Sequence, residues 1–173
     1  MAKLSDMTLA PLVALLGFMT LNKPVLAINA ASAATVKTTN AVNYTSNGVS
    51  LSKAALSAQS IAVTHTMNGT VAGGAYVQPA STTVYYTLGV DNAGAITVSQ
   101  GSYAGQNNSV VQAGVSAVGT GAVPDVPAGV TPFGVVKVVT NGSTTFTAGT
   151  TALDAAGVTA TYFDVAVLPS GAL

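Results

Sequence analysis

The chain contains no cysteine, tryptophan, arginine or glutamate, and charged residues make up only 6% of its 173 residues. The five bases are lysines and the five acids are aspartates, so the formal net charge is zero. Without cysteine there is no disulfide framework and no thiolate nucleophile or thiolate metal site. Nucleic-acid binding requires clustered cations. The lysines are scattered, which argues against a nucleic-acid partner (they are Lys3, Lys23, Lys37, Lys53 and Lys137).

Hydrophobic residues make up 49% of the chain, and the remainder is dominated by Thr, Ser, Gly and Asn. A surface with so few charges has little colloidal stability as a free monomer. The composition therefore indicates a protein that works in contact with copies of itself or with a larger assembly.

The longest apolar segment is the 13-residue run Leu9–Leu21, which lies between Asp6 and Lys23. It is too short for a membrane-spanning helix, which needs about 20 such residues. We interpret residues 1–33 as an N-terminal arm or anchor, either a short helix or an extended segment. Its apolar side chains are the candidate contacts with a partner: Leu9, Leu12, Val13, Leu15, Leu16, Phe18, Met19 and Leu21. The alternative is the apolar region of a secretory signal peptide, cleaved near the small residues 30–33.

Residues 34–173 read as a mainly β-domain, because short β-branched runs alternate with Gly, Asn, Pro and Ser. The clearest strand is Thr82–Val90, which reverses at residues 91–94 and returns along Ala95–Ser99. Asn47-Gly48 predicts a hairpin turn. Such a succession of short strands predicts an antiparallel β-sandwich or barrel.

The same patterns predict the structure of the remaining segments. A long loop is expected at about residues 101–131, with at most one short strand near Ser109–Val115. Ser52–Ala58 is expected to form one or two helical turns. Thr144–Phe146 is expected to pair back onto a strand at Phe133–Thr140, and Val158–Val167 is the last expected strand.

No combination of residues in the sequence predicts a catalytic, cofactor-binding or metal site. His65 is the only histidine and falls beside Ile61 and Val63 on one face of an alternating segment, which favours a partly buried or interfacial imidazole. No motif marks a nucleophile or an orienting acid for it. Asp164 lies among aromatic and β-branched residues, so we expect a structural hydrogen bond or a salt bridge with Lys137. The chain is therefore predicted to be non-enzymatic and to need no cofactor.

The C-terminal third carries a succession of motifs. Residues 126–129 read VPAG and lead to FGVVKV at 133–138, followed by TFTAGTTALD at 145–154 and VTATYFD at 158–164. This succession resembles a recurrent pattern in virion structural proteins of tailed bacteriophages, which include capsid decoration (cement) and head-fibre proteins. The resemblance covers roughly residues 82–169.

The resemblance implies a non-catalytic decoration protein, a homotrimer on the outer surface of the virion capsid with the major capsid protein as partner. It would stabilise the capsid against internal pressure. Three alternatives remain open. A fibre or receptor-binding protein would use the loop at 101–131 and Tyr103. A secreted bacterial surface protein would lose its N-terminal segment, and an enzyme would depend on His65.

Overall fold

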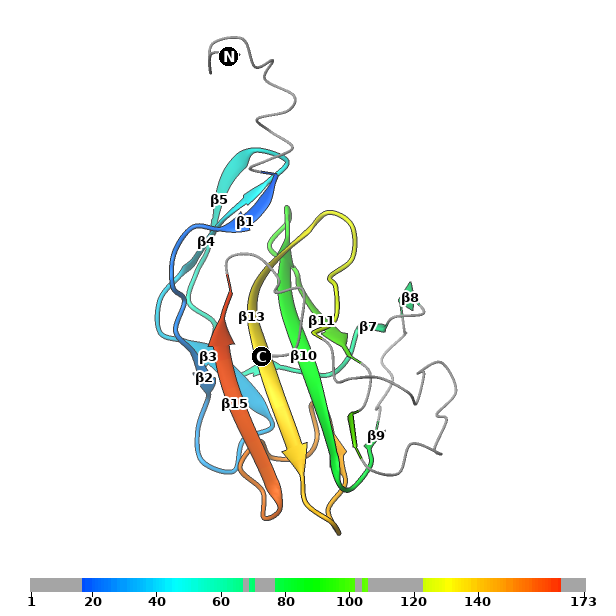
Figure 1. Ribbon diagram of the computed structural model, residues 1–173. Coiled ribbons are helices and arrows are strands. Elements are labelled where there is room, and N and C mark those ends of the chain that lie inside the picture. Colours follow the sequence, from blue (N-terminus) through cyan, green and yellow to red (C-terminus); the bar gives the residue numbers. More distant parts are fainter. Residues whose placement is uncertain (1–16, 67–68, 71–76, 102–103, 106–122, 166–173) are drawn as a thin grey trace, which may run out of the picture.

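The computed structural model describes residues 17–66, 69–70, 77–101, 104–105 and 123–165 (Figure 1). These residues form strands, turns and irregular segments and contain no helix. The fifteen strands are β1 (Phe18–Thr20), β2 (Leu26–Ile28), β3 (Thr35–Thr38), β4 (Val42–Ser46), β5 (Val49–Lys53), β6 (Gln59–Ser60), β7 (His65–Thr66), β8 (Gly69–Thr70), β9 (Val77–Gln78), β10 (Thr82–Asp91), β11 (Ile96–Gln100), β12 (Ala104–Gly105), β13 (Val130–Thr140), β14 (Phe146–Thr147) and β15 (Val158–Asp164). The prediction of a mainly β-protein is confirmed.

The largest sheet has the order β15-β13-β10-β11-β7-β8. In addition, β12 pairs with Thr82 and Thr83, the first residues of β10. Its two long central strands, β10 and β13, run antiparallel with a register shift between Leu88 and Gly89. Every pairing in this sheet is antiparallel except that of β11 with β7. The path has two ends, at β15 and β8, so the described strands form an open sheet and no closed barrel.

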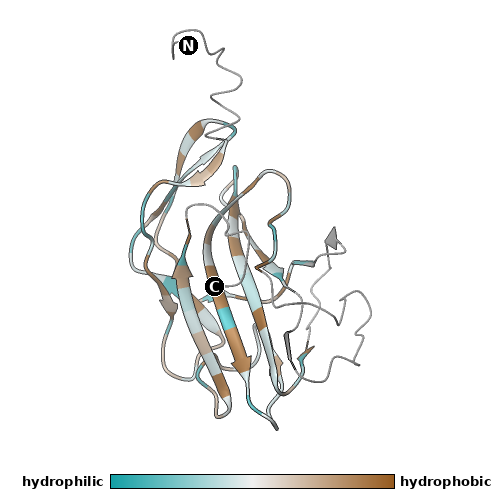
Figure 2. Ribbon diagram, viewed as in Figure 1, coloured by the Kyte–Doolittle hydropathy of each residue, from teal (hydrophilic) through white to brown (hydrophobic). Residues whose placement is uncertain are grey.

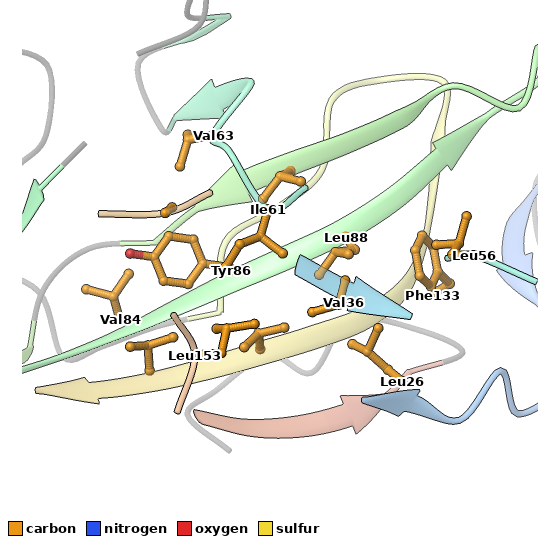
Figure 3. Close-up of a cluster of buried hydrophobic side chains, with 14 of the residues drawn as sticks. Leu26, Val36, Leu56, Ile61, Val63, Val84, Tyr86, Leu88, Phe133 and Leu153 are labelled. Atoms are coloured by element: carbon orange, nitrogen blue, oxygen red, sulfur yellow. The ribbon is translucent and has the colours of Figure 1, made fainter. Parts of the chain in front are cut away.

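A second layer packs against the inner face of this sheet. The sheet β2-β3-β6 supplies Leu26 and Val36 to the core, and these side chains cluster with Leu88 and Phe133 of the main sheet (Figure 3). Gly134 permits the close approach of the two layers, because a Cβ there would lie 2.7 Å from Cδ2 of Leu26. The arrangement is a β-sandwich, one of the two architectures, sandwich or barrel, that the sequence predicts.

Polar groups tie the short strands to the core. Gln78 of β9 is fully buried, and its amide donates to the carbonyl oxygens of Thr82 and Val138, each at 3.1 Å. The Tyr86 hydroxyl donates to Oε1 of Gln78 at 3.3 Å. These bonds satisfy carbonyl groups on β10 and β13, so a buried amide is compatible with the core.

Both faces of β10 are covered, which the alternation in the sequence did not predict. Val84, Tyr86 and Leu88 face the inner core. On the opposite face Tyr85 is 3% exposed and Thr87 is fully buried. Thr87 Oγ1 donates to the carbonyl oxygen of Pro124 at 2.9 Å, so the segment before β13 covers this face.

Two sequence predictions are wrong. Ser52–Ala58 forms no helical turn, because β5 continues to Lys53 and the next residues are irregular. Thr144–Phe146 does not pair back onto the preceding strand; β14 pairs with β9, while β13 has β10 and β15 as neighbours. The expected loop at about 101–131 already contains β12 and the first residues of β13. The strand expected near Ser109–Val115 lies outside the described residues.

The segment interpreted as an arm enters the sandwich. β1 pairs antiparallel with β4, and β2 pairs antiparallel with β3. Residues 18–28 therefore belong to the folded sheets, whereas residues 1–16 lie outside the described part of the chain. In Figure 1 the sheet β1-β4-β5 stands at one end of the main sheet.

Candidate interaction surface

Several apolar side chains stay exposed on and around the first strands. Phe18 is 37% exposed, Leu21 50%, Val25 39% and Val49 58%. We call these four residues the N-terminal apolar surface. Figure 2 shows hydrophobic positions in brown on the small sheet to which β1 and β5 belong. Phe18 and Val49 lie on the same face of this sheet, and exposed apolar side chains that gather on one face are typical of contact surfaces.

The register of the small sheet explains why Phe18 and Val49 are exposed. Phe18 lies opposite Ser46, which in turn lies opposite Val49. Residues opposite each other on neighbouring strands share a face, so Phe18 and Val49 flank Ser46. Two residues along, Thr20 and Tyr44 on the same face are buried. The face thus packs on the domain at one end and presents apolar side chains to solvent at the other.

The strand that carries Phe18, β1, and its neighbour β4 are held in place by hydrogen bonds, one of them buried. Thr20 Oγ1 donates to the carbonyl oxygen of Pro132 at 2.7 Å, and Leu21 N donates to the carbonyl oxygen of Asn43 at 2.7 Å. In the opposite sense, Thr131 Oγ1 donates to the carbonyl oxygen of Thr45 at 2.7 Å. Because both β1 and β4 are bonded to β13, Phe18 and Leu21 are presented on a fixed scaffold.

A shallow groove of about 330 Å³ adjoins Leu21. It is lined by Thr20, Leu21, Asn22, Lys23, Asp164 and Val165. The Asn22 side chain is engaged, since Nδ2 donates to the carbonyl oxygen of Ala41 at 2.7 Å and Oδ1 accepts from Asn43 N at 2.9 Å. Lys23 is exposed on its rim. The groove therefore places the Leu21 side chain near both a cation, Lys23, and a carboxylate, Asp164.

The structure describes three of the predicted contact residues. Phe18 and Leu21 are exposed, and Met19 is half-buried on β1. The others lie outside the described residues: Leu9, Leu12, Val13, Leu15 and Leu16. Their role as contacts remains a prediction.

Sequence reasoning missed Val25 and Val49. Val25 has a positive φ of 60°, an unusual conformation for a β-branched residue. It follows Pro24, and nothing in the local pattern signals this conformation. Val49 follows the Asn47-Gly48 turn directly, so its position at a hairpin tip was a usable signal for exposure.

A polar row crosses the outer face of the main sheet. His65 lies opposite Ser99, which lies opposite Thr87 on the next strand. His65 is half-buried and Ser99 is 1% exposed, and neither Nδ1 of His65 nor Oγ of Ser99 has a hydrogen-bond partner in the described residues. A Ser-His-acid triad requires an acid bonded to the imidazole nitrogen remote from the nucleophile. The row shows no such orienting bond at Nδ1.

Three aspartates are engaged by backbone N–H groups. Asp91 Oδ1 accepts from Ala93 N at 2.9 Å and Ala95 N at 2.8 Å, as expected for a turn. Asp164 Oδ1 accepts from Leu26 N at 2.9 Å, so the structural hydrogen bond predicted for Asp164 is confirmed.

Asp154 is the third of these aspartates, and Lys137 contacts an aromatic ring. Asp154 Oδ2 accepts from Ser32 N at 2.9 Å, which joins the turn before β15 to the loop between β2 and β3. Lys137 Nζ lies 5.6 Å from the centre of the Tyr85 ring, a cation–π contact. In the described residues no three His, Asp or Glu side chains gather as metal ligands.

Comparisons with known proteins identify no relative: no family model matches the chain, and neither the curated proteins nor the solved structures contain a match. In the part of the chain that the structure describes, no helix has the length and apolar character to cross a membrane.

Proposed function

We propose that this chain is a non-enzymatic structural protein of a tailed-phage virion that decorates the outside of the capsid. The N-terminal apolar surface is the observation that carries the proposal. Phe18 and Leu21 are exposed on and next to β1, which is bonded to β13, and they form the end of the apolar run Leu9–Leu21. A contact surface built from both segments would bind the major capsid protein.

The few charges suit such a contact. An interface formed by these residues would be mainly apolar and hydrogen-bonded, so its strength would depend little on salt. A specific interface buries about 1,600 Å² in total. Repetition over the shell multiplies the gain, and each bound copy adds contacts that must break before neighbouring subunits separate under the pressure of packaged DNA. The homotrimer implied by the family resemblance is part of this proposal.

The proposal is tested by mixing purified protein with undecorated capsids and imaging them by electron cryomicroscopy. We expect stoichiometric knobs on the outer surface. Val49→Asp should lower occupancy at least about tenfold, a loss of about 1.4 kcal/mol, because a carboxylate would enter an apolar contact. Val139→Asp is the matched control, since Val139 is also exposed, at 37%, but lies on β13.

Equal occupancy for the two variants would contradict the role of the N-terminal apolar surface. Density at tail or fibre positions would redirect the proposal to receptor binding. Absence of any particle association would contradict the virion assignment and favour the secreted surface protein.

A further inference from the structure

The outer edge of β15 is unpaired in the described structure. β15 ends the main sheet, and β13 is the strand to which it is hydrogen-bonded. In Figure 1 it lies at one side of the sheet, with β2 and β3 in the layer behind it. An unpaired edge presents a row of N–H and C=O groups that can accept another strand.

The pairing with β13 shows which groups point outward. Val165 N donates to the carbonyl oxygen of Phe133 at 3.2 Å, and Asn141 N donates to that of Gly157 at 2.9 Å. Inward and outward groups alternate along an antiparallel strand. Residues 157, 159, 161, 163 and 165 therefore bond to β13, and the N–H and C=O groups of Ala160 and Tyr162 point away from it.

β15 lacks most of the features that natural proteins use to block such an edge. Lysine, proline, bulges and very short strands are the usual means. β15 has seven residues, VTATYFD, with neither lysine nor proline, and its register with β13 is unbroken. Its single charge, Asp164, already accepts the hydrogen bond from Leu26 N.

We propose that this edge pairs antiparallel with the same edge of a second copy of the chain, about a two-fold axis at Thr161. This residue is the centre of β15, so all seven residues overlap in that register. Ala160 of one copy then lies opposite Tyr162 of the other, and the pair exchanges both outward hydrogen bonds on each side of the axis.

Side chains and charge fit the same register. On the inner face the small Ala160 faces the large Tyr162, and on the outer face Thr159 faces Phe163. Asp164 lies opposite Val158, so no like charges meet. Val158 N is already bonded to the carbonyl oxygen of Ala155 at 2.9 Å and is not available to the second copy. The two pairs of Ala160 with Tyr162 therefore supply most of the hydrogen bonds between the copies.

This inference does not rest on the proposed function. Identical edges that pair antiparallel are related by a two-fold axis, and this holds whether or not the protein binds a capsid. In a decorated shell the pairing would join neighbouring trimers rather than build the trimer.

Sedimentation velocity of the full chain over a range of concentrations tests the pairing. We expect a concentration-dependent dimer. Ala160→Pro removes an outward N–H and no bond to β13, so it should weaken the dimer at least tenfold with little change in melting temperature. Thr161→Lys places two ammonium groups opposite each other and should act in the same direction.

Ser50→Lys is the matched control, because it adds a lysine to an exposed position on β5, the edge strand of another sheet. It should leave the dimer unchanged. A wild-type chain that stays monomeric at every concentration would overturn the proposal. So would self-association, as a dimer or a trimer, that both β15 variants leave unchanged.

Discussion

Asp164 and Leu26 are 138 residues apart in sequence, and the Asp164 carboxylate accepts a hydrogen bond from the Leu26 backbone N–H at 2.9 Å. The bond joins the end of the last strand, β15, to the start of β2 in the other layer of the sandwich. It lies beside Gly134, over which the Leu26 side chain packs. The carboxylate thus holds together the two layers where they approach closely.

Replacing Asp164 with alanine should lower the free energy of unfolding by about 1–3 kcal/mol, because the partly buried Leu26 N–H would lose its acceptor. Asp164→Asn is the control, since its amide oxygen can still accept the bond. Urea denaturation followed by circular dichroism measures both. Equal losses for the two variants would show that the charge, and not the acceptor, is what matters.

A chain that begins at Ala34 should be much less stable than one that begins at Gly17. The shorter chain lacks β1 and β2 and removes Leu26 from the core, and loss of a buried leucine side chain alone costs about 2–5 kcal/mol. Thermal melts of the two purified chains make the comparison. Equal melting temperatures would contradict the integration of residues 18–28 into the sandwich and would fit a cleaved leader.

Gly149→Ala should destabilise the protein more than Gly129→Ala. Both glycines have positive φ, 77° and 84°, so each substitution carries a backbone cost of about 1–2 kcal/mol. A Cβ at Gly149 would also lie 2.8–2.9 Å from atoms of Ala62, whereas nothing lies within 4 Å at Gly129. Overpacking adds about 1–3 kcal/mol at Gly149. Chemical denaturation measures the free energy of unfolding of both variants. Equal losses for Gly149→Ala and Gly129→Ala would contradict this account.

Tyr162 should make stability fall at high pH. Burial, with a smaller contribution from the Asp154 carboxylate, raises the pKa of the Tyr162 hydroxyl from 10.0 to about 12. The folded state therefore holds this proton more tightly than the unfolded state does. Its contribution is fully present below pH 10 and is lost as the pH rises toward 12.

Tyr162→Phe tests this assignment, because phenylalanine keeps the ring and removes the ionisable hydroxyl. The free energy of unfolding of the variant should depend less on pH between 10 and 12 than that of the wild type. Identical pH profiles would assign the alkaline loss to another group. Tyr44 is the obvious alternative, since burial and Asp91 also raise its pKa.

Local patterns predicted the elements that depend on nearby residues. Alternation located β10 and its hairpin with β11, and the Asn-Gly pair located the turn between β4 and β5. Asn47 and Gly48 both have positive φ, 51° and 78°, as a tight hairpin turn requires. The steric preference of each residue acts within a few positions, so it can be read from the sequence.

Pairing between distant segments was less accessible. The strand at Phe146 was recognised, but its partner is β9, whose Gln78 side chain donates to carbonyl oxygens of both β10 and β13. The covered outer face at Thr87 and the parallel pairing of β7 with β11 were likewise missed. A strand's own sequence specifies its faces, but its neighbour depends on which other strand completes the layer.

The sequence alone determined that this is a β-protein of low charge, with strands where β-branched residues alternate and turns where Asn and Gly occur. The turn before Val49 favours its exposure, but only the tertiary structure decided which apolar residues remain in water. Val42 and Val49 are equivalent in type and lie on the two strands of one hairpin, yet Val42 is fully buried and Val49 is 58% exposed. The small sheet is covered by the core at one end and open at the other, and burial depends on what packs against a residue, which its own sequence does not contain.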